Sequence, residues 1–327
     1  MQTIEIGGLS VRPGQRALGK TLCGELPDGT PVHHPLIVVN GAGDGPLLWL
    51  GAGLHGTEIP GMEVIRRVTR EVVDPTRLRG GIVAAPLLNP FSYHHHQMVT
   101  PQDGYNLNRV FPGNPASLLS HRLAAQIARL AEPCDVCIDF HANPTPAMQF
   151  SIVKHSGNDA VWERSLALAR AFGITTIEMV PTHEQHRTGT FSDLVQERGK
   201  PCLVLELIAW RRFDGVSLAA GVRGTLNVMR HLGMWDGAVE RQSGFPIIEG
   251  PLSRVELTAN RGGLVHTLKE AGEAIRQGET IALVRDLWGD VVEEVQAPRD
   301  GWILAWPFLG NQAVATGDIL VFIAFRK

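Results

Sequence analysis

The stretch LLWLGAGLHGTEIPGMEVIRRVTREVV, residues 47–73, carries the pattern that decides the fold. It begins with an apolar run typical of a buried strand, and from Met62 to Val72 apolar residues recur at helical spacing. His55 and Glu58 therefore fall in the loop between a predicted strand and a predicted helix. In α/β proteins, such loops at the carboxyl ends of strands are where ligands bind.

The same alternation of apolar runs and amphipathic segments continues on both sides of this stretch. Further strand-like runs occupy residues 36–39, 81–89, 134–140, 174–180 and 202–210, and helical periodicity occupies residues 116–132, 159–173, 190–199 and 216–233. Because the strand-like runs lack strict polar alternation, we expect helices on both faces of their sheet. The predicted fold class is α/β.

The two ends of the chain differ from this central part. After about residue 244, helical periodicity stops, and short β-type runs at 263–269, 279–286, 289–298, 301–306 and 318–327 are separated by glycine, proline and aspartate. The first 35 residues are predicted to form strands that lead into the sheet. We therefore divide the chain into an N-terminal β segment (1–35), a central α/β domain (36–243) and a small C-terminal all-β domain (244–327).

Composition excludes several classes of partner. With 44% hydrophobic and 19% charged residues, the 327-residue chain can bury a large core. Its net charge of -3 means that no overall positive charge attracts nucleic acid or anionic lipid.

No apolar run reaches the about 18 residues that a membrane helix needs, and the first ten residues lack a signal-peptide pattern. We expect a cytoplasmic protein with a small-molecule partner, without nucleic acid or membrane, that could form a homo-oligomer.

Two of the four cysteines, Cys134 and Cys137, form a C-x-x-C within an apolar run. Residues three apart on a strand face opposite sides and cannot chelate one metal together, and a redox pair is expected at a helix start instead. We therefore predict that both cysteines belong to the core.

Three side chains of the metal-binding type stand at two predicted strand ends. His55 and Glu58, three residues apart in a tight loop, can both reach one cation, and His141 follows the strand-like run 134–140. If the two strands are parallel, all three lie at the same edge of the sheet. Imidazole and carboxylate ligands suit zinc, which takes three protein ligands in catalytic sites. We predict one zinc ion per chain; a buried core histidine is the alternative for His141 alone.

Two further features could complete such a site. Glu206 lies in the middle of an apolar run, where a carboxylate is costly unless it has a partner, so it is either a general base beside the metal or half of a structural ion pair. Asn108 and Arg109 belong to the polar turn at residues 103–113. The planar guanidinium of the arginine and the amide of the asparagine could bind a carboxylate. A solvated loop is the alternative for that turn.

Four motifs in fixed order resemble a known family. H-G-x-E at 55–58, N-L-N-R-x-F-P-G at 106–113, D-x-H at 139–141 and L-E-L at 205–207 resemble the succinylglutamate desuccinylase and aspartoacylase family of zinc hydrolases, and the likeness covers nearly the whole chain. It implies a mixed sheet related to that of zinc carboxypeptidases, with residues 36–243 as the catalytic domain. The residues it implies are the zinc ligands His55, Glu58 and His141, the base and acid Glu206, and the carboxylate-binding pair Asn108 and Arg109.

The chain departs from the family pattern at one position. The deacetylase-like branch reads R-x-x-P-x-D-G before the N-L-N-R turn, and Met98 stands where the arginine would be. In the family, that arginine is thought to stabilise the oxyanion or to bind a carboxylate of the substrate. The candidates to replace it are the histidines 94–96 and Arg187.

The resemblance implies hydrolysis of a linear amide by a metal-activated water, with an N-acyl amino acid as the favoured substrate. A zinc carboxypeptidase acting on a peptide or peptide-like polymer is the alternative enzyme, since the same arginine could hold a terminal carboxylate. A metal-binding protein without turnover is the third reading, and the presence of Glu206 beside all three ligands argues against it.

Overall fold

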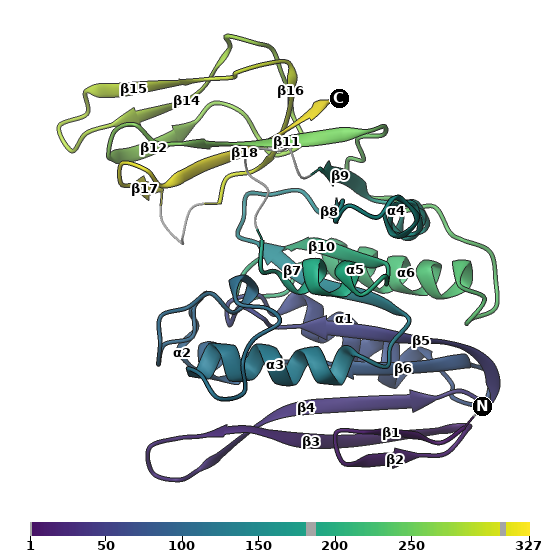
Figure 1. Ribbon diagram of the computed structural model, residues 1–327. Coiled ribbons are helices and arrows are strands. Elements are labelled where there is room, and N and C mark those ends of the chain that lie inside the picture. The colour runs from purple at the N-terminus through teal and green to yellow at the C-terminus, as the bar shows by residue number, and fades with distance from the viewer. Residues whose placement is uncertain (1, 181–187, 308–311) are drawn as a thin grey trace.

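A twelve-stranded sheet runs through the computed structural model, which describes residues 2–180, 188–307 and 312–327 (Figure 1). Its strands are, from one edge to the other, β13 (Ala274–Ile275), β16 (Gly301–Ala305), β18 (Ile319–Arg326), β11 (Leu252–Thr258), β9 (Thr175–Met179), β8 (Phe150–Lys154), β10 (Cys202–Ile208), β7 (Val136–Asn143), β5 (Gly43–Ala52), β6 (Arg79–Ala85), β4 (Pro31–Asn40) and β3 (Gln15–Glu25).

The sheet is mixed, and its central strands are parallel. Strand β5 pairs in parallel with β6 and with β7, and β7 pairs in parallel with β10. Strand β8 runs antiparallel to β10, and β4 runs antiparallel to β6. Because β5, β7 and β10 are parallel, their carboxyl ends meet at one edge of the sheet, as the predicted metal site requires.

Helices cover both faces of this sheet, which confirms the predicted α/β class. One face packs against α1 (Pro60–Arg67), the π-helical turn at Val68–Val72, α4 (Asp159–Phe172) and α6 (Gly215–His231). The other face packs against α2 (Pro90–His95), α3 (Leu119–Ala131) and α5 (Phe191–Glu197). Cys134 and Cys137 are buried as free thiols in the second of these cores, as predicted.

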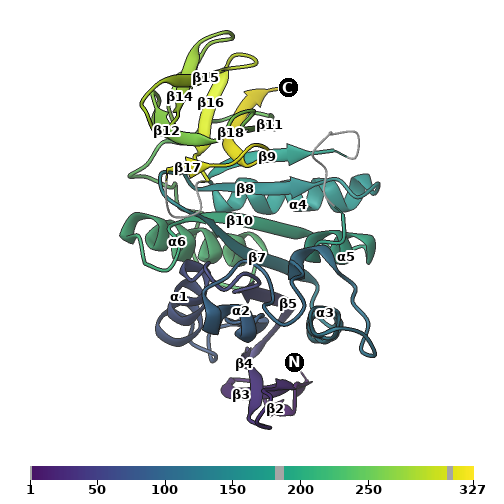
Figure 2. The ribbon, with the colours of Figure 1, turned by 90° about the vertical axis from the view of Figure 1, so that its left-hand side faces the viewer.

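The C-terminal region is all-β, as predicted, but it is not separate from the large sheet. Strand β11 pairs in parallel with β9 at Leu252 and Ile177, so the large sheet continues into C-terminal strands (Figures 1 and 2). A second sheet of four strands contains β15 (Val291–Gln296), β14 (Thr280–Arg285), β12 (Gly263–Thr267) and β17 (Ala313–Val314). A shared apolar core joins it to β16 and β18. The domain limits at residues 35 and 243 stay predictions.

The N-terminal residues form strands at the opposite end of the molecule (Figure 2). A hairpin of β1 (Ile4–Ile6) and β2 (Leu9–Val11) precedes β3, and β3 forms a long antiparallel ladder with β4. Across the described part of the chain, no helix combines the length and apolar composition needed to cross a membrane.

Candidate active site

The loop that carries His55 and Glu58 connects β5 to α1 and is held by a close backbone approach. A Cβ at Gly56 would lie 2.2 Å from the carbonyl carbon and oxygen of Ser92, so only glycine fits there. The Gly56 N–H donates to the carbonyl oxygen of Gln97 at 2.9 Å. Helix α1 then begins with a proline, whose missing N–H would have no partner in a first turn anyway. The loop geometry is thus fixed by Gly56, by the proline that starts α1 and by the backbone of residues 92–97.

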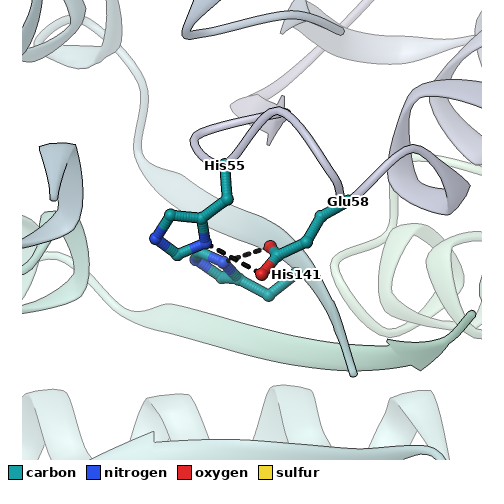
Figure 3. A group of neighbouring side chains, drawn as sticks. All are labelled: His55, Glu58 and His141. Carbon is teal, nitrogen blue, oxygen red and sulfur yellow. Dashed lines mark hydrogen bonds and ion pairs between the residues drawn. The ribbon is translucent and has the colours of Figure 1, made fainter. Parts of the chain in front are cut away.

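Parallel pairing of β5 and β7 brings His141 to this loop. Nδ1 of His55 lies 2.9 Å from Oε1 of Glu58, and Nδ1 of His141 lies 2.9 Å from Oε2 of the same carboxylate (Figure 3). All three side chains are buried, and their candidate ligand atoms lie within 4.8 Å of one another. The structure therefore brings together the three residues for which we predict a shared metal.

Each of these histidines has a second partner on its other ring nitrogen. The Nε2 of His55 lies 3.1 Å from Oδ1 of Asn106, and the Nε2 of His141 lies 3.1 Å from Oδ2 of Asp139. Both partners are oxygen acceptors, so each Nε2 is the donor. Metal-binding histidines are commonly held in this way, because the arrangement fixes the tautomer that leaves the other nitrogen for the cation. The donor set therefore fits a divalent cation.

The pKa shifts of Glu58 and His141 also fit a site for a cation. Burial alone would raise the pKa of Glu58, but the two histidines outweigh it and hold the pKa at about 2. Burial would lower the pKa of His141, whereas Asp139 and Glu58 raise it well above its usual value. The carboxylates of Glu58 and Asp139 thus favour a positive charge at this group, and a bound metal cation can supply it.

Glu206 lies directly beside the group. It is paired with His141 in the parallel register of β10 and β7, and its Oε2 accepts a hydrogen bond of 3.0 Å from Nδ2 of Asn143. Within the described parts of the chain, no cation lies within salt-bridge distance of this carboxylate, so the structural ion pair is not observed. Burial raises the pKa of Glu206 to about 7, against the opposing charges of His141 and Arg254. Such a carboxyl can both accept and release a proton near neutral pH.

Asn108 and Arg109 form a short 3₁₀ turn, Leu107–Arg109, next to the same group. Asn108 Oδ1 accepts from the Phe191 N–H at 2.8 Å, and Asn108 Nδ2 lies 3.3 Å from Nε2 of His141. Arg109 Nη1 donates to the Asn108 carbonyl oxygen at 2.6 Å. These contacts dock the turn onto the start of α5, and both side chains line the cavity described next.

A cavity of about 500 Å³ opens from the His55, Glu58 and His141 group. Besides the predicted residues, its lining contains further polar side chains, among them Asn106, Asn143, Lys154, Arg254 and Glu256. They come from loops and from strands β7, β8 and β11. The cavity thus combines residues from the central part of the chain with residues from its C-terminal strands.

Lys154 stands at the end of β8, a strand that the sequence analysis does not predict. Its ammonium group forms an ion pair with Asp193 and donates to Oγ1 of Thr190 at 3.2 Å. The run FSIVK at 150–154 is the signal that could have revealed it, because an apolar run that ends in a lysine is typical of a buried strand with a charge at its end. Lys154 adds a second positive charge close to Arg109.

Met98 also lines the cavity, where its Sδ accepts a hydrogen bond of 3.2 Å from Oγ1 of Thr57. The histidines 94–96 lie at the exposed end of α2 and are not among the lining residues. Arg187 lies outside the described residues. The structure therefore does not bring the three histidines to the position that Met98 occupies.

The mixed sheet, the two helical layers and the buried His–Glu–His group define a protein with the metallocarboxypeptidase-like fold. Residues 44–232 match the model of the succinylglutamate desuccinylase/aspartoacylase catalytic domain. Since this match spans more than half of the chain, the protein belongs to the succinylglutamate desuccinylase/aspartoacylase family, as the motifs indicated.

Individual relatives agree with this membership. The N-alpha-acetyl-L-2,4-diaminobutyric acid deacetylase of Halomonas elongata is 28% identical over 300 residues, which is 90% of this chain and 86% of the relative. A solved succinylglutamate desuccinylase/aspartoacylase structure from Rhodobacter sphaeroides matches with a TM-score of 0.83 and 26% identity, covering 95% of each chain. A metallo-carboxypeptidase from Burkholderia cenocepacia shares the fold, with a TM-score of 0.51 and 18% identity over 66% of this chain and 65% of that one.

Proposed function

We propose that this protein is a zinc-dependent hydrolase that cleaves the amide bond of an N-acyl amino acid. The observation that carries the proposal is the position of Glu206, a buried carboxyl in register with His141 of the candidate metal group, with no salt bridge to any cation among the described residues. Family membership and the relative named as a deacetylase support hydrolysis of an amide.

One zinc ion per chain would be held by Nδ1 of His55, Nδ1 of His141 and the carboxylate of Glu58. Bound there, a zinc ion would lower the pKa of a water molecule and polarise the carbonyl of the scissile amide. Asn106 and Asp139 would hold the two imidazole rings in the orientation that such binding needs.

Glu206 would move the proton in this reaction. Its carboxylate would accept a proton from the attacking water and then return it to the nitrogen of the leaving amine. The pKa of about 7 supports both transfers, and the hydrogen bond from Asn143 would keep one carboxylate oxygen in place while the other faces the cavity.

Arg109 and Asn108 would bind the carboxylate of the amino-acid part, and Lys154 adds positive charge near them. An N-acyl amino acid is favoured over a peptide-like polymer because strands of the C-terminal region contribute to the cavity wall and limit the room for an extended chain. We infer in addition that residues 36–243 act as the catalytic domain and residues 244–327 as the domain that closes the cavity.

The test is a panel of N-acyl amino acids and short peptides incubated with zinc-loaded protein, with released primary amine as the readout. We expect one free acid and one amino acid from each cleaved N-acyl amino acid, and turnover lower by roughly 10²-fold or more in Glu206→Gln. Stepwise release of C-terminal residues from peptides would favour the carboxypeptidase instead. Lack of hydrolysis across the whole panel would contradict the proposed function.

A further inference from the structure

Strand β11 delivers two charged residues to the cavity from outside the matched catalytic segment. In β11, Val255 and Leu257 pack against the C-terminal apolar core, so the alternate residues Arg254 and Glu256 face the other side. Both of these line the cavity. The pairing of β11 with β9 is what brings them there, because it continues the large sheet past the candidate metal site.

The guanidinium of Arg254 is buried and held in a fixed orientation. Only 7% of the residue is exposed, Nη2 donates to Oε1 of Glu256 at 2.7 Å, and Cζ lies 4.6 Å from the centre of the Phe322 ring. Phe322 is the register partner of Glu256 on β18. A guanidinium held in this way loses little freedom when it binds an oxygen of a ligand in the cavity that it lines.

The arrangement is poorly explained as a structural ion pair. Arg254 and Glu256 are two residues apart on one strand, so their contact connects no two elements of the fold. Buried ion pairs are often no more stabilising than apolar side chains of similar size. The ion pair with Glu256 is therefore, on its own, a weak structural explanation for the arginine.

The cationic side chains that line the cavity come from two parts of the chain, the central α/β part and the C-terminal strands. Arg109 and Lys154 lie close enough for the charge of Arg109 to lower the pKa of Lys154. Arg254 comes instead from β11, and it lines the same cavity as Glu206. Met98, which also lines the cavity, carries no charge. Arg254 thus brings a guanidinium to the cavity from the C-terminal strands, separately from Arg109 and Lys154.

We propose that Arg254 binds an anionic oxygen of the substrate in the cavity that it lines together with Glu206, so that the C-terminal β region completes the active site. This inference rests on the proposed function. The oxygen belongs either to a substrate carboxylate or to the amide carbonyl, which becomes negative when water adds. Both sources share the chemistry that a guanidinium recognises, and they differ in the kinetic step that Arg254 supports.

The experiment compares three variants in the zinc-loaded protein. Arg254→Met removes the charge and keeps most of the length, and Arg254→Lys keeps the charge without the planar fork. Arg299→Met is the matched control, because Arg299 lies over the ring of Phe325 in the same C-terminal region, but it is exposed and not among the residues lining the cavity. Unfolding midpoints of all variants separate a folding defect from a defect in binding.

The probes are N-acetyl-L-alanine and N-acetyl-L-alaninamide, studied by steady-state kinetics and, on the Glu206→Gln background, by calorimetry. A carboxylate source predicts that Arg254→Met raises KM and Kd for the free acid by roughly 10-fold or more and leaves the amide unaffected. An oxyanion source predicts that kcat falls by roughly 10²-fold for both probes while Kd stays constant. Arg254→Lys should recover part of either loss.

The two proposals can fail separately. If the wild type cleaves neither probe nor any member of the N-acyl panel, the proposed function fails, and calorimetry of the free acid still tests Arg254. The anion site would be overturned if Glu206→Gln with Arg254 intact did not bind the free acid in calorimetry and the wild type cleaved neither probe. Kinetics and binding of Arg254→Met indistinguishable from those of Arg299→Met would overturn it as well, whatever the unfolding midpoints.

Discussion

Glu206 and His141 are register partners on the adjacent parallel strands β10 and β7, so their side chains leave the sheet side by side. His141 turns its Nδ1 to Glu58, and Glu206 takes a neutral amide, that of Asn143, as its hydrogen-bond partner. One step of strand pairing thus sets the candidate base next to the candidate metal group. Neither residue needs a loop movement to reach the other.

Replacement of Glu206 by glutamine should separate metal binding from chemistry. The amide keeps the shape of the side chain and cannot accept the proton, so turnover should fall by roughly 10²-fold or more while zinc content and unfolding midpoint stay unchanged. Initial rates and metal analysis on the same preparations check this. Glu197→Gln, at the exposed end of α5, is the control and should be fully active. Near-normal turnover in Glu206→Gln would assign the base to another residue.

Replacement of Arg109 by lysine tests the anchor for the substrate carboxylate. Lysine keeps the charge but loses the two-pronged contact, so kcat/KM should fall while zinc binding does not. Amidation of the substrate should cause a similar loss in the wild type. Because both changes remove one interaction, the two losses should not add in a double-mutant cycle. Full additivity would exclude the pairing of Arg109 with that carboxylate.

The buried histidine of β4 should make stability depend on pH. His34 is fully buried, its Nδ1 lies 3.4 Å from the Leu87 carbonyl oxygen, and burial lowers its pKa to about 4. The unfolded chain, with a pKa near 6.5, takes up the proton first, so the free energy of unfolding should fall as pH falls from 6.5 to 4. The expected loss is up to about 3 kcal/mol over that window.

Urea denaturation of the wild type and of His34→Gln checks this pH dependence. The variant cannot take up the proton, so the stability difference between the two proteins should shrink as the pH falls from 7 to 4. His231→Gln, at the exposed end of α6, should follow the wild type at every pH. A difference between wild type and His34→Gln that does not change with pH would show that His34 is not the responsible group.

The sequence predicts the parts of the site that local patterns encode. His55 and Glu58 follow a strand and precede a helix within one short stretch, and His141 follows the apolar run at 134–140, which predicts a strand. Parallel pairing of neighbouring strands then brings their ends together, which is a general property of such sheets. The helices at 159–173 and 216–233 were equally predictable, because their apolar faces recur at helical spacing.

The parts that sequence patterns do not predict depend on pairing between distant segments. Strand β11 lies in residues 244–262, where we predict no strand, and Arg254 reaches the cavity only because β11 pairs with β9. Lys154 was missed with strand β8, which is short and antiparallel to β10. The alternation of Arg254 and Glu256 with Val255 and Leu257 was the available signal, but it does not specify which strand will be the neighbour.

The central claim is that one metal ion, held by His55, Glu58 and His141, makes this protein an amide hydrolase. Its most direct test is to remove metal with a chelator and titrate zinc back, following both bound zinc and amine released from the best N-acyl amino acid of the panel. We predict that activity is lost on chelation and returns in full at about one zinc per chain, and that His141→Ala neither binds that zinc nor recovers. Full activity in the metal-free protein, or stoichiometric zinc in His141→Ala, would contradict the account.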